Sequence, residues 1–226
     1  MKATLESRKS VRLNWFTQNN VPFSAKRELD FSYTLGNVQY NEISHTVYLH
    51  YVFTNLENPI PDTKIIIFDG GLPQSYLHTI GSVGKKISTD KIVDGDLTVM
   101  DRIVKVDQGE DKITTKPVPP FESHLYKEIQ IHEREDRVKR KITIKNESDQ
   151  PIKDLEVTFI ENKEVNFSES IPTPEKVDAP EYSWMITIPG GSTASIELNV
   201  VSHQKNTYKI EKPHKNTEDS PGFRQI

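Results

Sequence analysis

The feature that most constrains this fold is an alternation of apolar and polar residues with a period of two. In the N-terminal half it is clearest over residues 46–54, where Val47, Leu49, Tyr51 and Phe53 would share one face. A β-strand turns successive side chains to opposite faces, whereas a helix repeats every 3.6 residues. The sequence has no helical stripe of convincing length. The pattern therefore predicts an all-β chain with little helix.

Several other segments have the same period and are separated by turn-forming sequences. Strands about 8 to 15 residues apart with turns between them are typical of β-sandwiches. Residues 72–116, which glycines cut into short pieces, could be either short strands or loop. We expect two stacked β-sandwich units of the immunoglobulin-like kind. The remaining expected strands are residues 11–16, 29–35, 64–68, 125–131, 138–145, 155–160, 182–188 and 194–201.

The length of 226 residues allows one large β domain or two of about 100 residues each. Three prolines between Pro117 and Pro120 favour an extended connector, because proline disfavours the interior of a sheet. We therefore predict an N-terminal β domain (1–116), a connector (117–120), a C-terminal immunoglobulin-like sandwich (121–212) and a flexible tail (213–226).

Composition excludes several classes of protein. The net charge of −4 comes from 29 basic and 33 acidic residues, which is too balanced to suggest a nucleic-acid binder. The absence of cysteine excludes disulfides, thiolate zinc sites and cysteine nucleophiles, and it favours a reducing compartment. No apolar run is long enough for a signal peptide or a membrane span. We expect a soluble cytoplasmic protein, or an extracellular one if a leader has been removed.

Residues 138–201 have a recognisable shape. It combines Lys141-Ile142-Thr143-Ile144-Lys145-Asn146 with Gln150-Pro151-Ile152 and Leu155-Glu156-Val157, and continues with Trp184-Met185-Ile186-Thr187-Ile188 and Pro189-Gly190-Gly191-Ser192. This shape resembles the C-terminal β-sandwich of the mucoidy-inhibitor-like family, a domain of unknown function. It also occurs in generic immunoglobulin-like modules. The resemblance implies a fold and no catalytic residues.

No local motif predicts a catalytic, cofactor or metal site. The sequence has no G-x-S-x-G elbow, P-loop or G-x-G-x-x-G. The seven histidines are too scattered for a recognisable metal motif, and we interpret them as surface or structural residues. Asp94-Gly95-Asp96 lacks the ligand spacing of a calcium loop and is typical of an acidic turn. We expect no cofactor, and the sequence does not identify a small-molecule ligand.

Two features suggest a surface for a partner. Charged residues crowd positions 127–141, which is typical of an edge strand protected against aggregation or of an electrostatic docking patch. Tyr48 lies beside His50 on the more polar face of its strand and could mark an interface. The candidate interface residues are Tyr48, His50, Arg134, Arg137 and Arg140.

Three functions remain open. The first is a non-catalytic protein-binding or assembly module, with another protein or a second copy as its partner. The second is a ligand- or carbohydrate-binding protein, or a hydrolase, whose site is built from loops in residues 72–116. The third is a structural subunit of an envelope or viral assembly. An enzyme is the less favoured class.

Overall fold

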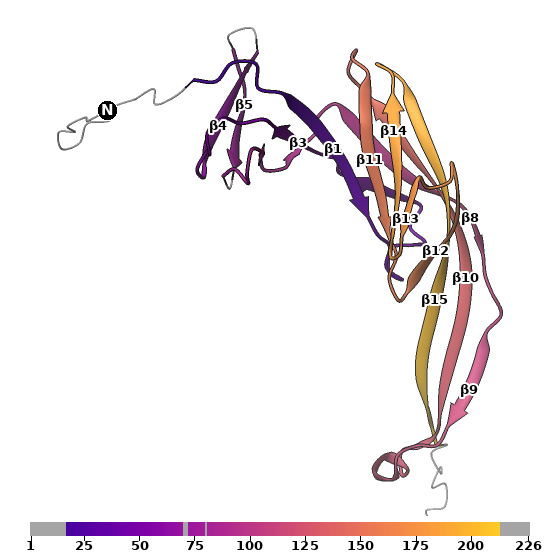
Figure 1. Cartoon of the computed structure of the whole chain (residues 1–226). Coiled ribbons are helices and arrows are strands. Elements are labelled where there is room, and N and C mark those ends of the chain that lie inside the picture. Colours follow the sequence, from indigo (N-terminus) through magenta and orange to yellow (C-terminus); the bar gives the residue numbers. More distant parts are fainter. Residues whose placement is uncertain (1–16, 70–71, 80, 213–226) are drawn as a thin grey trace, which may run out of the picture. The chain divides into compact units, whose positions relative to one another are not determined.

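The computed structural model describes residues 17–69, 72–79 and 81–212, and these residues form an all-β fold (Figure 1). The all-β prediction is confirmed. Within this part of the chain the helical content is one 3-10 turn, Pro120–Glu122. The expected strand at residues 11–16 and the expected tail at 213–226 lie outside the described residues.

The chain divides into two compact units, each built from two separate stretches of sequence. The first contains the described residues up to Leu29 together with Thr46–Gly95, and the second contains Asp30–His45 together with the chain from Asp96 onward. The division does not fall at the proline-rich segment 117–120. Residues 96–116 belong to the second unit because their two strands pair with a strand that follows those prolines.

The first unit contains a small sheet and a hairpin. The sheet joins β1 (Phe23–Phe31), β3 (Tyr48–Phe53) and β6 (Ile87–Ser88), and β7 (Ile92–Val93) also pairs with β3. The hairpin joins β4 (Thr63–Asp69) to β5 (Leu72–Thr79). The expected sandwich is not confirmed for this unit.

The second unit encloses its core between two sheets. In the first sheet β13 (Lys176–Asp178), β14 (Glu181–Ile188) and β11 (Ile152–Ile160) are neighbours, and β1 follows β11. In the second sheet the order is β12 (Val165–Ile171), β15 (Thr193–Glu211), β10 (Tyr126–Asn146), β8 (Leu97–Asp107) and β2 (Glu42–His45). β9 (Lys112–Lys116) also pairs with β10.

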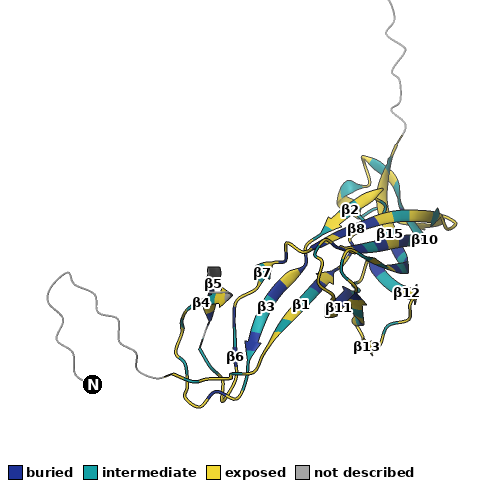
Figure 2. Ribbon diagram, turned by 90° about the horizontal axis from the view of Figure 1, so that it is seen from above, coloured by how far each residue is buried: buried dark blue, intermediate teal, exposed yellow. Residues whose placement is uncertain are grey.

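Buried side chains of the second unit come from both sheets, as the alternation requires. They include Leu155, Val157, Phe159, Trp184 and Ile188 from one sheet, and Val138, Ile142, Ile144, Ile196, Leu198 and Val200 from the other. Figure 2 shows buried and exposed residues alternating along these strands.

β10 differs from the sequence expectation. The sequence predicts two strands, 125–131 and 138–145, but one strand of 21 residues runs through the charged segment between them. The charged residues do not break the strand because its alternation continues through them, with Asp136, Val138 and Arg140 all buried. β10 is also not an edge strand, since it lies between β15 on one side and β8 and β9 on the other.

β10 and β15 remain paired far beyond the strands that face them (Figure 1). Together with β9 they form a three-stranded extension of the second sheet, which we call the ribbon: residues 112–116, 126–134 and 204–211. His132 and Tyr208 pack edge to face in the ribbon, with ring centroids 4.9 Å apart. Cross-strand ion pairs, such as Lys205 with Glu133, add to its pairing.

Candidate functional site

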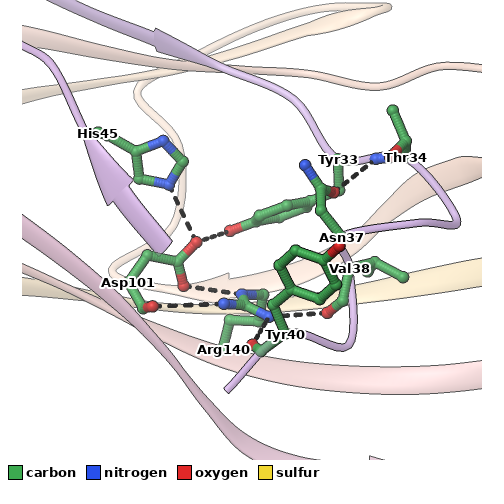
Figure 3. Close-up of polar contacts among 8 residues, drawn as sticks. All are labelled: Tyr33, Thr34, Asn37, Val38, Tyr40, His45, Asp101 and Arg140. Carbon is green, nitrogen blue, oxygen red and sulfur yellow. Dashed lines mark hydrogen bonds and ion pairs between the residues drawn. The ribbon is translucent and has the colours of Figure 1, made fainter. Parts of the chain in front are cut away.

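A buried ion pair lies at the centre of the second unit (Figure 3). Arg140 of β10 and Asp101 of β8 both have 0% side-chain exposure, and Arg140 Nε donates to Asp101 Oδ1 at 2.8 Å. Arg140 Nη1 donates to the carbonyl oxygens of Val38 and Tyr40 at 2.7 and 2.9 Å. A buried charge is tolerated when its hydrogen-bonding groups are satisfied in this way. Arg140 therefore holds the segment after β1 against the sheet.

Two further side chains from that segment complete the network. Tyr33 donates its hydroxyl to Asp101 Oδ2 at 2.7 Å, and His45 Nε2 lies 3.0 Å from the same oxygen. Burial raises the pKa of Tyr33 well above its ordinary value, and the charge of Asp101 raises this pKa further. The hydroxyl therefore stays protonated and remains a donor to the carboxylate.

A second buried carboxylate, Asp136, lies on the same strand as Arg140. Asp136 accepts hydrogen bonds from Gln39 Nε2 (3.0 Å), Arg134 Nη2 (3.1 Å) and Gln204 Nε2 (3.2 Å). Gln39 lies between Val38 and Tyr40, whose carbonyl groups Arg140 binds. One short segment thus links the two buried charges.

Asp136 also fixes a break in the edge of the sheet. β8 pairs with β10 as far as Asp107 opposite Arg137, and β9 resumes at Lys112 opposite Glu133. Between them Gly109 N–H donates to Asp136 Oδ1 at 3.2 Å. A Cβ at Gly109 would lie 2.2 Å from the carbonyl oxygen of Glu135, so only glycine lets the loop approach this closely.

A pocket of about 1030 Å³ lies at this break. Most of its lining residues are charged: they include five lysine or arginine residues and five carboxylates. The charged lining residues are Asp107, Glu110, Lys112, Glu133, Arg134, Glu135, Arg137, Lys163, Glu164 and Lys205, and His203 and Gln204 lie among them.

Most of these charges already have a partner. Asp107 pairs with Lys105, Glu133 with Lys205 and Glu135 with His203, while Glu164 accepts the backbone N–H of Leu35. The hydrogen bond and charge of Lys205 lower the pKa of Glu133. Among the described residues, no ion pair or side-chain hydrogen bond is found for Lys112, Arg137, Lys163 or Glu110. Three cations and one carboxylate of the lining are therefore available to a ligand.

The pocket adjoins an open strand edge. β12 pairs with β15 only as far as Val165 opposite Ser202, and His203 N–H then donates to Glu164 O at 2.8 Å. His203 therefore points its backbone groups away from β10. Since backbone groups alternate in direction along a strand, those of Lys205, Thr207 and Lys209 also point outward. Within residues 17–69, 72–79 and 81–212 no backbone partner reaches them.

The structure places the predicted interface residues in three environments. Arg134 and Arg137 line the pocket together. Arg140 is interior, so its inclusion in a surface patch is corrected: it lies in phase with the buried residues of β10. Tyr48 and His50 belong to the first unit, where Tyr48 is 41% exposed and His50 Nδ1 lies 3.7 Å from Glu28.

Sequence reasoning missed Asp101, Asp136 and Gly109 as organising residues. A signal was present for Asp101, which continues the buried alternation of Leu97 and Val99. The same parity places Asp136 in line with Val138. Neither pattern reveals which residue on a distant strand neutralises the charge.

Comparison with family models, curated proteins and solved structures finds no match for the chain. No group of three or more potential metal ligands is found among the described residues. The described chain also contains no helix long and apolar enough to cross a membrane.

Proposed function

We propose that this chain is a non-catalytic protein-binding module that takes up an extended segment of a partner by β-strand addition along the free edge of β15, residues 204–211. The supporting observation is that the outward backbone groups of Lys205, Thr207 and Lys209 have no partner among the described residues. Such an edge is a template for another strand, and many recognition domains use it in this way.

The charges of the ribbon are consistent with a selective edge. Lysine on an edge strand discourages indiscriminate pairing between copies of a protein. Lys205 is paired with Glu133 of β10 and Lys209 with Glu122 of the 3-10 turn, so both ammonium groups already have a partner within the chain. The backbone between them stays available, so a partner would be recognised by its main chain first.

The test is selection from a library of random peptides of about eight residues, displayed with free C-terminal ends, against the full chain. Thr207→Pro removes one outward N–H, and proline is tolerated on an edge strand where that N–H faces solvent. We expect this substitution to weaken the binding of the selected peptides about tenfold or more, because it removes one hydrogen bond and its ring keeps the peptide backbone from approaching β15 closely. Thr207→Ala is the matched control and should bind within about twofold of the original chain.

Circular dichroism would establish that both variants are folded. The proposal fails if no peptide is selected, or if the selected peptides bind Thr207→Pro as tightly as Thr207→Ala. Light scattering of the chain alone tests the competing case, in which a second copy occupies the edge. If the chain forms a dimer and Thr207→Pro dissociates it, the edge is occupied by a second copy of the chain and not by a foreign partner.

The pocket supports a second candidate, a ligand site to which residues 72–116 contribute the loop Asp107–Lys112 while β10, β15 and the turn before β12 supply most of the other lining residues. Its mixed charges favour a polar or charged ligand. The mucoidy-inhibitor-like sandwich that the chain resembles has no assigned activity, so the resemblance supports neither proposal.

A further inference from the structure

We infer that the segment bound along β15 ends in the pocket, and that Lys163 receives its C-terminal carboxylate. This inference rests on the proposed strand addition and adds the direction and the chemical identity of the bound end. Its evidence is the position of β12, the position of Lys163 and the charges of the pocket.

β12 establishes the direction. It occupies the same side of β15 as the free edge and runs antiparallel to β15, beginning at Val165 opposite Ser202. Antiparallel pairs are also the commoner kind in sheets generally. A segment added in line with β12 therefore runs from Glu211 towards Gln204, and its last residue reaches the place where β12 begins.

Lys163 is held at that place by a tight turn. Asn162 N–H donates to Val165 O at 3.0 Å, and Asn162 Oδ1 accepts from the N–H groups of Glu164 and Val165 at 2.9 and 3.1 Å. Glu164 O is in turn the acceptor for His203 N–H. Glu164 is thus the residue at which the occupied part of the β15 edge ends, and Lys163 comes immediately before Glu164 in the sequence. A strand added along the free edge would therefore stop against Lys163.

The charges of the pocket suit a terminal carboxylate. Lys163 is exposed, and within the described part of the chain it has no ion pair. Asp107, Glu133 and Glu135 each have a basic partner, and Glu164 accepts one backbone N–H. Among the described lining residues Lys112, Arg137 and Lys163 have no ion pair, and Glu110 is the one carboxylate without a partner. A carboxylate beside an ammonium group forms a charge-assisted hydrogen bond. The pocket volume of about 1030 Å³ leaves room for the final side chain as well.

The experiment uses the peptides selected above, synthesised as free acids and as C-terminal amides. We expect amidation to weaken binding about tenfold at low salt, and less at high salt because Lys163 is exposed. Lys163→Gln should cause a similar loss for the free acid and little further loss for the amide, since both changes remove the same contact. Lys153→Gln, at an exposed lysine of β11, is the matched control and should leave both forms unchanged.

A nitroxide label at the first peptide residue reports the direction, since it should broaden amide signals near Glu211 and leave those near Lys163 sharp. The inference is overturned if acid and amide bind equally, if Lys163→Gln has no effect, or if the label broadens signals near Lys163. These outcomes differ from failure of strand addition itself, in which Thr207→Pro would leave the affinity of every peptide unchanged.

Discussion

Replacing Arg140 by methionine tests the role of the buried network most directly. Methionine keeps most of the apolar volume but removes all four hydrogen bonds of the guanidinium group, to Asp101 Oδ1, Asp101 O, Val38 O and Tyr40 O. Asp101 would then remain buried with its charge supported only by Tyr33 and His45.

The expected loss of stability follows from these contacts. Hydrogen bonds contribute about 1 kcal/mol each in net terms, so four give roughly 4 kcal/mol. Breaking a buried ion pair by removing one partner costs about 3–5 kcal/mol, which agrees. We therefore expect Arg140→Met to lower the free energy of unfolding of the second unit by about 3–5 kcal/mol.

The assay is urea unfolding followed by tryptophan fluorescence. Of the two tryptophans, Trp184 is buried in the second unit, so a Trp15→Phe background makes the signal report on that unit. Following one unit matters because a chain of two units need not unfold in a single step. Lys139→Met, next in sequence and partly exposed in its pair with Glu197, is the control and should cost less than about 1 kcal/mol.

Combining Arg140→Met with Asp101→Asn completes a double-mutant cycle. The neutral amide that replaces the Asp101 carboxylate would carry no uncompensated charge, so the double variant should lose about 1–3 kcal/mol less than the sum of the two single losses. A loss below about 1 kcal/mol for Arg140→Met, or simple additivity in the cycle, would refute the view that this pair anchors the segment after β1.

Three other predictions concern neighbouring residues. Burial raises the pKa of Tyr33, so its protonated form is favoured in the folded state. The resulting contribution to the free energy of unfolding is complete below pH 10, the ordinary tyrosine pKa, and declines as the pH rises above that value. The stability advantage over Tyr33→Phe, measured by urea unfolding, should therefore shrink as the pH rises above about 10, and a constant difference would contradict this. Gly109→Ala should destabilise the second unit by about 1–3 kcal/mol because the added Cβ meets the Glu135 carbonyl oxygen, and hydrogen exchange should show faster exchange of the backbone N–H at position 109; unchanged exchange would argue against the close approach. Asn146→Ala removes the buried amide that donates to Gln150 O, Ile188 O and Pro189 O, so thermal unfolding should report a loss of about 1–3 kcal/mol, and a loss no larger than that of an exposed alanine substitution would exclude this role.

Many of the strands and buried positions of the second unit can be predicted from the local alternation of apolar and polar residues. The buried positions of β10 and β15 follow a period of two, because a strand that packs one face against another sheet must place apolar residues at every second position. The alternation also predicts that Arg140 is buried, because Arg140 lies on the same face of β10 as Val138 and Ile142. The residue type opposed that interpretation, since arginine is rarely buried without a partner.

The first unit and the unpredicted strands show where this reasoning fails. β5, β12 and β13 lack a clear apolar alternation that would predict them as strands, and β8 and β9 stay open between strand and loop on sequence alone. Their extended conformation depends on hydrogen bonds to a neighbouring strand, which their own side chains do not encode.

The sequence by itself determined that the chain is β-rich, lacks cysteine chemistry and places apolar residues on one face of its long strands. Tertiary structure alone decided that Arg140 meets Asp101, 39 residues away, that Asp136 holds Gly109, and that the pairing of β12 with β15 extends no further than Ser202 and leaves the rest of the β15 edge open. The physical reason is one of range. Periodicity is set by the geometry of a single strand, whereas the partner of a buried charge and the end of a pairing depend on strands brought together from distant parts of the chain.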